Sequence, residues 1–520
     1  MSMRVLFVMA SPEYLRYYDS TIDELAARGH DVAVAVNSRR EAKPIGLQRL
    51  SALGGHVRVL GVTPSPSGRW YSIGRGLRGI TDFVRYLHPD YSGAGALRTR
   101  MKHKAVPPGF RIIDRIPALS ARATGRVIAL LATCERAIPL NRDVVRFLRA
   151  ERPDVVLLSP LVDAASMQVE YVKAAHALGI PSAACIASWD NLTNKGLLRT
   201  VPNAVIVWNE AQRHEAVAYH DAAPEQVIVT GAPLFDRWFA TSMTRPRAEF
   251  CSHIGLPDDR PFVLFTGSSN FIADSNVEVD FVRRWVAVLR AADEPVLRGI
   301  NVVVRPHPYN CDAWQRIESW DSGVIVYPRL GYSPLAPNSR IDFYDSIFHC
   351  AAVVGINTSA MIEAAIVGRP VLSIQAPEFA ATQEGTLHFH HLLPENGGCV
   401  SLASTITGHV SQLADRLRHP DVARDETRRF VASFVRPNGV DRPATPIMAD
   451  AVESVARLSA QPRTESSART AAIRAVLLLL GAYGGVCRWW TGADRGDQVK
   501  KQAGHRTVRR AWSLWLGRRL

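Results

Sequence analysis

Three apolar runs in the second half of this sequence each end in residues that could bind an oxyanion. Small polar or basic residues follow each run directly: Gly267, Ser268 and Ser269 after the first, Arg305 and His307 after the second, and Asn357, Thr358 and Ser359 after the third. Backbone N–H groups, hydroxyl groups, guanidinium groups and imidazole groups all donate hydrogen bonds to phosphate. The three segments together therefore predict a site for the phosphates of a nucleotide.

The third segment, residues 351–374, reads AAVVGINTSAMIEAAIVGRPVLSI. Its first run is short, apolar and β-rich, as in a buried parallel strand. Asn357, Thr358 and Ser359 are good N-cap residues for the helix that follows, and a helix N-terminus stabilises an anion. Glu363 lies about one turn further in, where its carboxylate could accept hydrogen bonds from a ribose. An ordinary capped strand–helix unit explains this segment equally well.

Arg305 and His307 belong to the sequence RPHP, in which two prolines prevent a strand or helix from continuing. Both side chains are therefore expected on a rigid loop at the carboxyl end of a strand, where open α/β sheets bind ligands. With Ser268, Thr358 and Ser359, they are the expected donors that stabilise a departing nucleotide phosphate.

In the first half, the segment with the most reactive side chains is SWDNLTNKG, residues 188–196, which follows an expected strand. Asp190 is the candidate general base for an acceptor hydroxyl. A loop-stabilising Asx turn is the alternative role for this carboxylate.

Alternating strand and helix patterns predict an α/β protein with two Rossmann-like domains, each built on a parallel sheet, that face a cleft. The expected strands cover residues 3–11, 32–36, 56–62, 154–159, 180–188, 203–210 and 226–236 in the first half, and 262–266, 302–305, 324–327, 353–355 and 371–374 in the second. We place the first domain at 1–237 and the second at 238–458.

Within the first domain, residues 63–126 form an insertion rich in Pro, Gly, Arg and aromatic residues. A solvated insertion is one interpretation. The other is a basic lid over an anionic acceptor such as a lipid phosphate.

The tail, residues 459–520, differs in character from the rest of the chain. Its apolar core, residues 475–487, is shorter than the roughly 20 residues that a membrane-spanning helix needs. Residues 461–520 hold 12 basic and 3 acidic residues, a net charge of +9, and four tryptophans stand among them: Trp489, Trp490, Trp512 and Trp515. Tryptophan beside cations is typical of interfacial helices, so a membrane surface is favoured over a subunit contact or a disordered tail.

The composition of the 520 residues excludes several classes of protein. The seven cysteines show no CxxC spacing, which fits a reducing cytoplasm and argues against a disulfide scaffold or a zinc site. His388, His390 and His391 lack a clear carboxylate or cysteine partner in the sequence, so we expect no metal site. No signal peptide is expected at the N-terminus. The net charge of +14 lies largely in the tail, so a membrane surface is favoured over nucleic acid as its partner.

The second half resembles the donor-binding domain of the GT-B superfamily of glycosyltransferases. The relatives of that superfamily include CDP-glycerol glycerophosphotransferases, bacterial sialyltransferases and non-hydrolysing UDP-N-acetylglucosamine 2-epimerases. The RPHP sequence resembles the HP motif of the first two groups of relatives. NTSAMIEA, residues 357–364, resembles their Ser/Thr motif and the ribose-binding glutamate seen across GT-B enzymes. The resemblance covers roughly residues 1–455, and it implies that the last helix, expected at residues 445–458, crosses back to the first domain.

The resemblance implies a glycosyltransferase, for which we expect no cofactor. No metal is required if the expected phosphate donors neutralise the charge of the leaving group. The tail predicts that the enzyme is peripheral on the cytoplasmic face of the cell membrane. It would move a sugar or polyol phosphate from a nucleotide-activated donor to an envelope polysaccharide or lipid-linked acceptor. The alternatives are a CDP-glycerol-type glycerophosphotransferase, a UDP-sugar 2-epimerase-like enzyme and a non-catalytic nucleotide-binding scaffold. The HGTP motif of the glycerophosphotransferases has no copy here, and SWDN stands in a comparable place, which weakens the case for glycerophosphate transfer.

Overall fold

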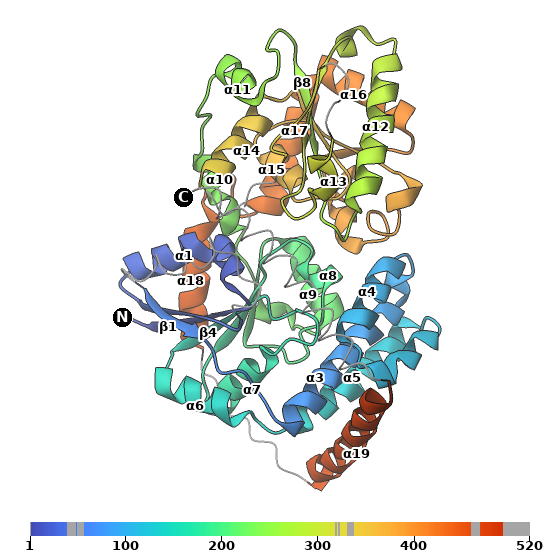
Figure 1. Ribbon diagram of the computed structural model, residues 1–520. Helices are drawn as coiled ribbons and strands as arrows, with labels where there is room; N and C mark the ends of the chain where they lie inside the picture. The colour runs from blue at the N-terminus through green and yellow to red at the C-terminus, as the bar shows by residue number, and fades with distance from the viewer. Residues whose placement is uncertain are drawn as a thin grey trace, which may run out of the picture.

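The computed structural model describes residues 2–38, 57–317, 323–329, 337–458 and 468–491, together with residues 48 and 320. The described side chains are those of all these residues except 337 and 483–491. Two α/β domains, one above the other in Figure 1, account for most of this part of the chain.

The first domain contains a seven-stranded sheet in the order β3-β2-β1-β4-β5-β6-β7. Its strands are β1 (Arg4–Met9), β2 (Asp31–Val36), β3 (Arg58–Val62), β4 (Val155–Ser159), β5 (Ser182–Cys185), β6 (Ala204–Val207) and β7 (Val227–Val229). All neighbouring strands are parallel. The sheet packs against helices that include α1 (Leu15–Ala27), α6 (Arg142–Glu151), α7 (Val169–Leu178) and α9 (Glu210–His220). Packing on both faces explains why β1 and β4 read as continuous apolar runs.

The second domain contains a six-stranded parallel sheet in the order β10-β9-β8-β11-β12-β13. Its strands are β8 (Phe262–Thr266), β9 (Asn301–Arg305), β10 (Val324–Val326), β11 (Ala352–Gly355), β12 (Val371–Ile374) and β13 (Val400–Ala403), and its helices include α11 (Arg247–Ile254), α12 (Ser275–Ala291), α14 (Pro337–His349), α15 (Ala360–Ile366), α16 (Ile406–Arg418) and α17 (Pro420–Phe430). The prediction of two Rossmann-like domains, each built on a parallel sheet, is confirmed. Strand β13 and helix α16 were not predicted. Two central residues of β13 are only half-buried, so the strand lacks a continuous apolar run.

Helix α18 (Ala444–Ala456) follows the second domain in sequence but packs on the first sheet. Its residues Met448, Ala449 and Val452 are buried in one hydrophobic cluster with β1 and β2. Figure 1 shows α18, in orange, beside α1, whereas α17 lies in the upper domain. The expected return of the last helix to the first domain is therefore found.

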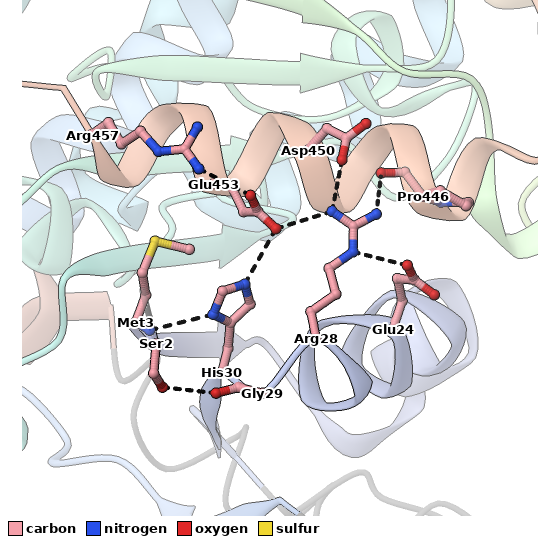
Figure 2. A network of polar contacts seen from close by, with 10 residues as sticks. All are labelled: Ser2, Met3, Glu24, Arg28, Gly29, His30, Pro446, Asp450, Glu453 and Arg457. Carbon is pink, nitrogen blue, oxygen red and sulfur yellow. Dashed lines mark hydrogen bonds and ion pairs between the residues drawn. The ribbon is translucent and has the colours of Figure 1, made fainter.

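A polar network at the end of α1 fixes α18 in this place (Figure 2). Arg28 donates through Nη1 to Asp450 at 2.6 Å and to Glu453 at 3.0 Å, and through Nε to Glu24 at 2.9 Å. His30 Nε2 lies 3.3 Å from the same Glu453 carboxylate. The RGH sequence between α1 and β2 thus contacts a helix that lies more than 400 residues away in the chain.

The insertion is helical. It contains α3 (Arg69–Val84) and α4 (Gly95–Ala105), and it ends within α5 (Ala121–Ala137), which continues past residue 126. Phe83 of α3 and Leu97 of α4 belong to one small buried cluster. The insertion is therefore an ordered helical segment with buried apolar residues.

Helix α19 (Ala468–Thr491), the dark red helix at the bottom of Figure 1, packs against this insertion. Leu477 is buried against Leu77 of α3 and Ile138, and Arg474 Nε donates to the Ala137 carbonyl at 2.8 Å. Within the described part of the chain, no helix combines the length and apolar character needed to cross a bilayer. The last part of the predicted tail, residues 492–520 with Trp512 and Trp515, lies outside the described residues, as do the side chains of Trp489 and Trp490.

Candidate functional site

A cavity of about 690 Å³ lies between the two domains. In the second sheet, β8 lies between β9 and β11, so the loops after these three strands meet at one point of the sheet edge. This is where the order of strands reverses, the usual ligand site of such sheets. Nine of the predicted site residues line the cavity: Asp190, Gly267, Ser269, Arg305, His307, Asn357, Thr358, Ser359 and Glu363.

Gly267 allows the first two loops to approach each other closely. Its N–H donates to the Arg305 carbonyl at 2.8 Å. A Cβ atom at this position would lie 2.8 Å from the backbone nitrogen of His307 and 3.1 Å from the Pro306 Cα. Only glycine fits without displacing the RPHP backbone.

Ser268 is the exception among the predicted residues, because it does not line the cavity. It is fully buried, and its N–H donates to Glu278 Oε1 at 2.7 Å rather than toward a ligand. Burial raises the pKa of Glu278 to about 7, although the hydrogen bonds from Ser268 and Trp314 act in the opposite direction. The Ser268 N–H is thus used to hold the loop, and the donation from Ser268 to phosphate stays a prediction.

The RPHP loop displays two donors. Arg305 is 8% exposed, donates to Ser346 Oγ at 3.0 Å, and lies over the ring of Phe343. His307 Nδ1 accepts the N–H of Tyr309 at 3.2 Å. Because that nitrogen accepts, a neutral His307 ring carries its proton on Nε2, which makes Nε2 a hydrogen-bond donor.

Asn357, Thr358 and Ser359, which precede α15, do not all form the N-cap hydrogen bonds that the sequence predicted. Asn357 Nδ2 donates to the Thr382 carbonyl at 2.9 Å, so this side chain anchors a neighbouring loop. Thr358 Oγ1 accepts the Ala360 N–H at 3.4 Å. Ser359 makes no side-chain cap, so its predicted capping bond is not present. The hydroxyl groups of Thr358 and Ser359 are not used to cap the helix strongly, and both residues line the cavity.

Glu363 lies among arginines. Burial raises its pKa to about 8, although the guanidinium groups of Arg16, Arg237 and Arg305 act in the opposite direction. The pKa of Arg237 is also shifted. Burial, together with the positive charge of Arg340, lowers it to about 10. Arg340 forms no hydrogen bond or ion pair with the described residues, and burial lowers its pKa. Crowded, desolvated guanidinium groups of this kind mark a place that an anion would stabilise.

The loop that carries Asp190 is held by the helical insertion. Arg85 is buried and donates through Nη1 to the Gly196 carbonyl at 3.1 Å. Asp82, about one turn earlier, accepts the N–H of Leu197 at 2.9 Å. The insertion therefore positions the candidate base, which no local pattern in the sequence indicated.

The Asp190 carboxylate is ionised at neutral pH. Its oxygens accept hydrogen bonds from the side-chain amides of Asn191 and Asn194, each at 3.1 Å. Burial by itself would raise the pKa of Asp190, but nearby His388 and Lys195 together with the hydrogen bonds hold it below its ordinary value. The carboxylate makes no capping bond to the short helix that follows, so the Asx-turn alternative is not found.

His388 approaches Asp190 from the second domain. Its Nε2 lies 3.4 Å from Asn357 Nδ2, which can only donate, so the neutral ring carries its proton on Nδ1. Nδ1 is buried and has no hydrogen-bond partner among the described residues. Burial lowers the pKa of His388 to about 4, although the charge of Asp190 acts in the opposite direction. The ring is therefore neutral at neutral pH.

The other two histidines of this segment point to different partners. His390 Nε2 contacts the Glu384 carbonyl at 2.9 Å, and His391 Nε2 contacts Glu215 Oε1 at 2.5 Å. No group of three or more metal-ligating side chains occurs among the described residues.

Several residues that line the cavity were not predicted as site residues, although His388 was considered as a metal ligand: Arg16, Arg100, Arg237, Arg340 and His388. Arg16 alone had a usable signal, since it lies in the first turn of the helix that follows β1, at a strand end of the first sheet. The others reach the cavity from the insertion, the connector between the domains, α14 and a loop after β12, and no spacing in the sequence relates them.

No protein-family model matches the chain, and no curated protein matches its sequence. Among solved structures, the chain is similar to the UDP-GlcNAc 2-epimerase from Neisseria meningitidis bound to UDP-GlcNAc, with 14% identity, a TM-score of 0.48 and coverage of 87% of this chain and 100% of that one. It is also similar to a glycosyltransferase from Rickettsia africae, with 8% identity, a TM-score of 0.49 and coverage of 88% and 100%. A third is the calicheamicin glycosyltransferase, with 14% identity, a TM-score of 0.46 and coverage of 87% and 98%. The activity proposed below is argued from the residues of the site.

Proposed function

We propose that this protein is a glycosyltransferase that uses a nucleotide-activated sugar or polyol phosphate. The observation that carries the proposal is the convergence of two groups in one interdomain cavity. One group is a set of oxyanion donors around Arg305 and His307. These donors lie on loops of the second sheet and on neighbouring elements. The other is an ionised carboxylate, Asp190, on the opposite domain. Donors for a leaving phosphate and a base for an attacking hydroxyl are the two requirements of glycosyl transfer without a metal.

With a nucleotide-sugar donor, the acceptor hydroxyl loses its proton to Asp190 while its oxygen bonds to the anomeric carbon. The bond from that carbon to the phosphate oxygen breaks, and the nucleotide leaves with the electron pair. With a nucleotide-activated polyol phosphate, the acceptor oxygen bonds instead to the phosphorus of the polyol phosphate, and the bond from that phosphorus to the bridging oxygen breaks. Arg305 and the Nε2–H of His307 stabilise the charge that develops on the phosphate. Glu363 holds the ribose; its raised pKa keeps much of it protonated near neutral pH, which reduces repulsion from the phosphates.

Calorimetric titration with UDP-, GDP-, CDP- and CMP-linked compounds tests the proposal. We expect one nucleotide class to bind, and to bind more weakly to Arg305→Gln than to the wild type. Arg146→Gln is the matched control, because Arg146 is 77% exposed on α6, away from the cavity. Absence of binding by all four classes would contradict a nucleotide site. Binding followed by change of the donor alone, without an acceptor, would favour the epimerase-like alternative.

We further propose that the acceptor is an envelope glycan or lipid-linked glycan and that the protein binds a membrane surface through its tail. Three large apolar side chains of α19 support the membrane contact: Val476, Leu479 and Leu480 are 55%, 73% and 47% exposed. Residues 468–491 contain no acidic residue, and Arg122 and Arg126 on the adjacent helix α5 are exposed. Exposed apolar side chains beside cations match an anionic lipid surface.

A further inference from the structure

The arginines of the cavity fall into two separate groups. Arg16, Arg237 and Arg305 act on the titration of Glu363, and Arg340 acts on that of Arg237, so these four lie together at one end. Asp19 lies 3.6 Å from Arg237 and offsets part of their charge. The remaining positive charge still suffices for a nucleotide diphosphate, so the donor leaves no need for a further cation.

Arg100 lies apart from this group, at the Asp190 end of the cavity. It comes from α4 of the insertion, and its charge acts on His388 rather than on Glu363. Arg100 Nη2 donates to the Asn194 carbonyl at 3.3 Å, and the Asn194 side chain donates to Asp190 at 3.1 Å, so a single residue separates Arg100 from Asp190. Arg100 therefore lies where the acceptor, not the donor phosphate, must bind.

Among the described residues, Arg100 contacts a backbone carbonyl and an aromatic ring, and both of these groups are uncharged. Its Nη2 donates to the Asn194 carbonyl at 3.3 Å, and its guanidinium carbon lies 4.1 Å from the ring centroid of Phe271, in the loop after β8. No ion pair to Arg100 exists among the described residues. A guanidinium fixed by a carbonyl and an aromatic ring keeps its remaining N–H donors for a ligand, and its planar fork fits an oxyanion.

The buried side of this end supplies a second free donor. His388 is 3% exposed, and its Nδ1, which carries the proton of the neutral ring, has no partner among the described residues. Both His388 and Arg100 line the cavity. An unsatisfied buried donor of this kind costs free energy unless a ligand pairs with it.

We propose that Arg100 and His388 form a subsite for an oxyanion, phosphate or carboxylate, on the acceptor molecule, next to the hydroxyl that Asp190 deprotonates. Placing the anion on the acceptor rests on the proposed function, whereas the presence of a second oxyanion site does not. Arg100 belongs to the insertion of the first domain and His388 to the second domain, so an anion bound by both would contact the two domains at once.

Inorganic phosphate is the probe. It is titrated into protein saturated with the nucleotide (UDP, GDP, CDP or CMP) whose linked compound binds, or into free protein if none binds. We expect Arg100→Gln to weaken phosphate binding about tenfold or more, because hydrogen bonds to charged groups contribute that much. Nucleotide affinity should stay unchanged. Arg146→Gln, which removes an exposed arginine from α6, should match the wild type in both titrations.

Arg100→Lys keeps the positive charge but loses the planar fork of the guanidinium group, so its phosphate affinity should lie between those of the wild type and Arg100→Gln. This second variant keeps the test informative if Arg100→Gln misfolds. Equal phosphate affinity in the wild type, Arg100→Gln and Arg100→Lys would overturn the subsite. Acetate competing as well as phosphate identifies a carboxylate on the acceptor, and its failure to compete identifies a phosphate. If no nucleotide binds but phosphate binding still depends on Arg100, the proposed function fails and the oxyanion site stands.

Discussion

Trp189 of the first domain and His388 of the second lie edge to face, with ring centroids 4.7 Å apart. Trp189 is 5% exposed and is buried in a hydrophobic cluster made mostly of residues of the second domain. This contact places the loop that carries Asp190 against the second domain. The candidate base and the phosphate donors are therefore brought together by packing between domains.

His307→Ala should lower turnover about 10²- to 10³-fold, the usual effect of removing one donor to a developing oxyanion. Steady-state kinetics with the donor identified by titration measures this. His253→Ala is the matched control, since His253 is largely exposed on α11 and does not line the cavity. Unchanged turnover in His307→Ala would remove His307 from the mechanism.

Asp190→Asn should lower turnover about 10²- to 10⁴-fold, the contribution typical of general-base catalysis. Nucleotide affinity should be preserved, because Asp190 lies on the opposite domain from the phosphate donors. The same change should lower the pKa of His388 further, since the Asp190 charge raises it; NMR titration of the ring reports this shift. Full activity in Asp190→Asn would require another base.

Glu363→Ala should weaken nucleotide binding without unfolding the protein, because it removes the proposed ribose contact. Calorimetry measures the affinity and circular dichroism checks the fold. Glu210→Ala, a change at a largely exposed helical residue, provides the control. Equal nucleotide affinity in Glu363→Ala and the wild type would leave Glu363 as an ordinary helix residue.

Glu363 also predicts a pH dependence of stability. Its pKa in the folded protein, about 8, lies above the ordinary value of 4.5, so the fold favours the protonated form. The corresponding stabilisation is complete below the ordinary pKa and is lost as the pH rises through about 8. Glu363→Gln cannot ionise, so its melting temperature relative to the wild type should increase between about pH 5 and about pH 9. A constant difference between the two proteins over this range would contradict the burial argument.

Gly267→Ala should destabilise the protein by about 1–3 kcal/mol, the usual cost of forcing an extra group into a packed site. The new Cβ would meet backbone atoms of Pro306 and His307, which cannot rotate away. Gly125→Ala is a sharp control, because nothing lies within 4 Å of a Cβ at that position in α5. Denaturant titration should find the control neutral or slightly stabilised; a neutral Gly267→Ala would show that the RPHP loop yields easily.

Replacement of Leu479 and Leu480 by Asp should abolish flotation with anionic liposomes. These side chains are exposed in the present structure, so the change should not disturb the fold. Val422→Asp, an equivalent change at a 51% exposed residue of α17, should float like the wild type. A chain ending at residue 458 should stay folded, bind nucleotide and fail to float. If the unmodified protein does not bind anionic liposomes at low salt, binding to a partner protein becomes the better explanation of the tail's composition.

The sequence by itself determined the two parallel sheets and the loops that follow their strands. Continuous apolar runs such as those of β8 and β9 identify buried parallel strands, and the polar residues directly after them must then lie at the carboxyl edge. For that reason Arg305, His307 and Thr358 could be assigned to one site before any tertiary contact was known. The sequence GSS also identified Gly267 as a site residue, and the packing around position 267 requires a residue as small as glycine.

Tertiary structure alone decided the direction of individual groups and the residues that come from distant elements. Ser268 has the right type and position, but Glu278 captures its N–H from a helix ten residues away. Arg100 and His388 line the same cavity as Asp190 only because the insertion and the second domain both pack against the loop that carries Asp190. Such contacts depend on how whole elements pack against one another, and no local period or spacing in a sequence records that packing.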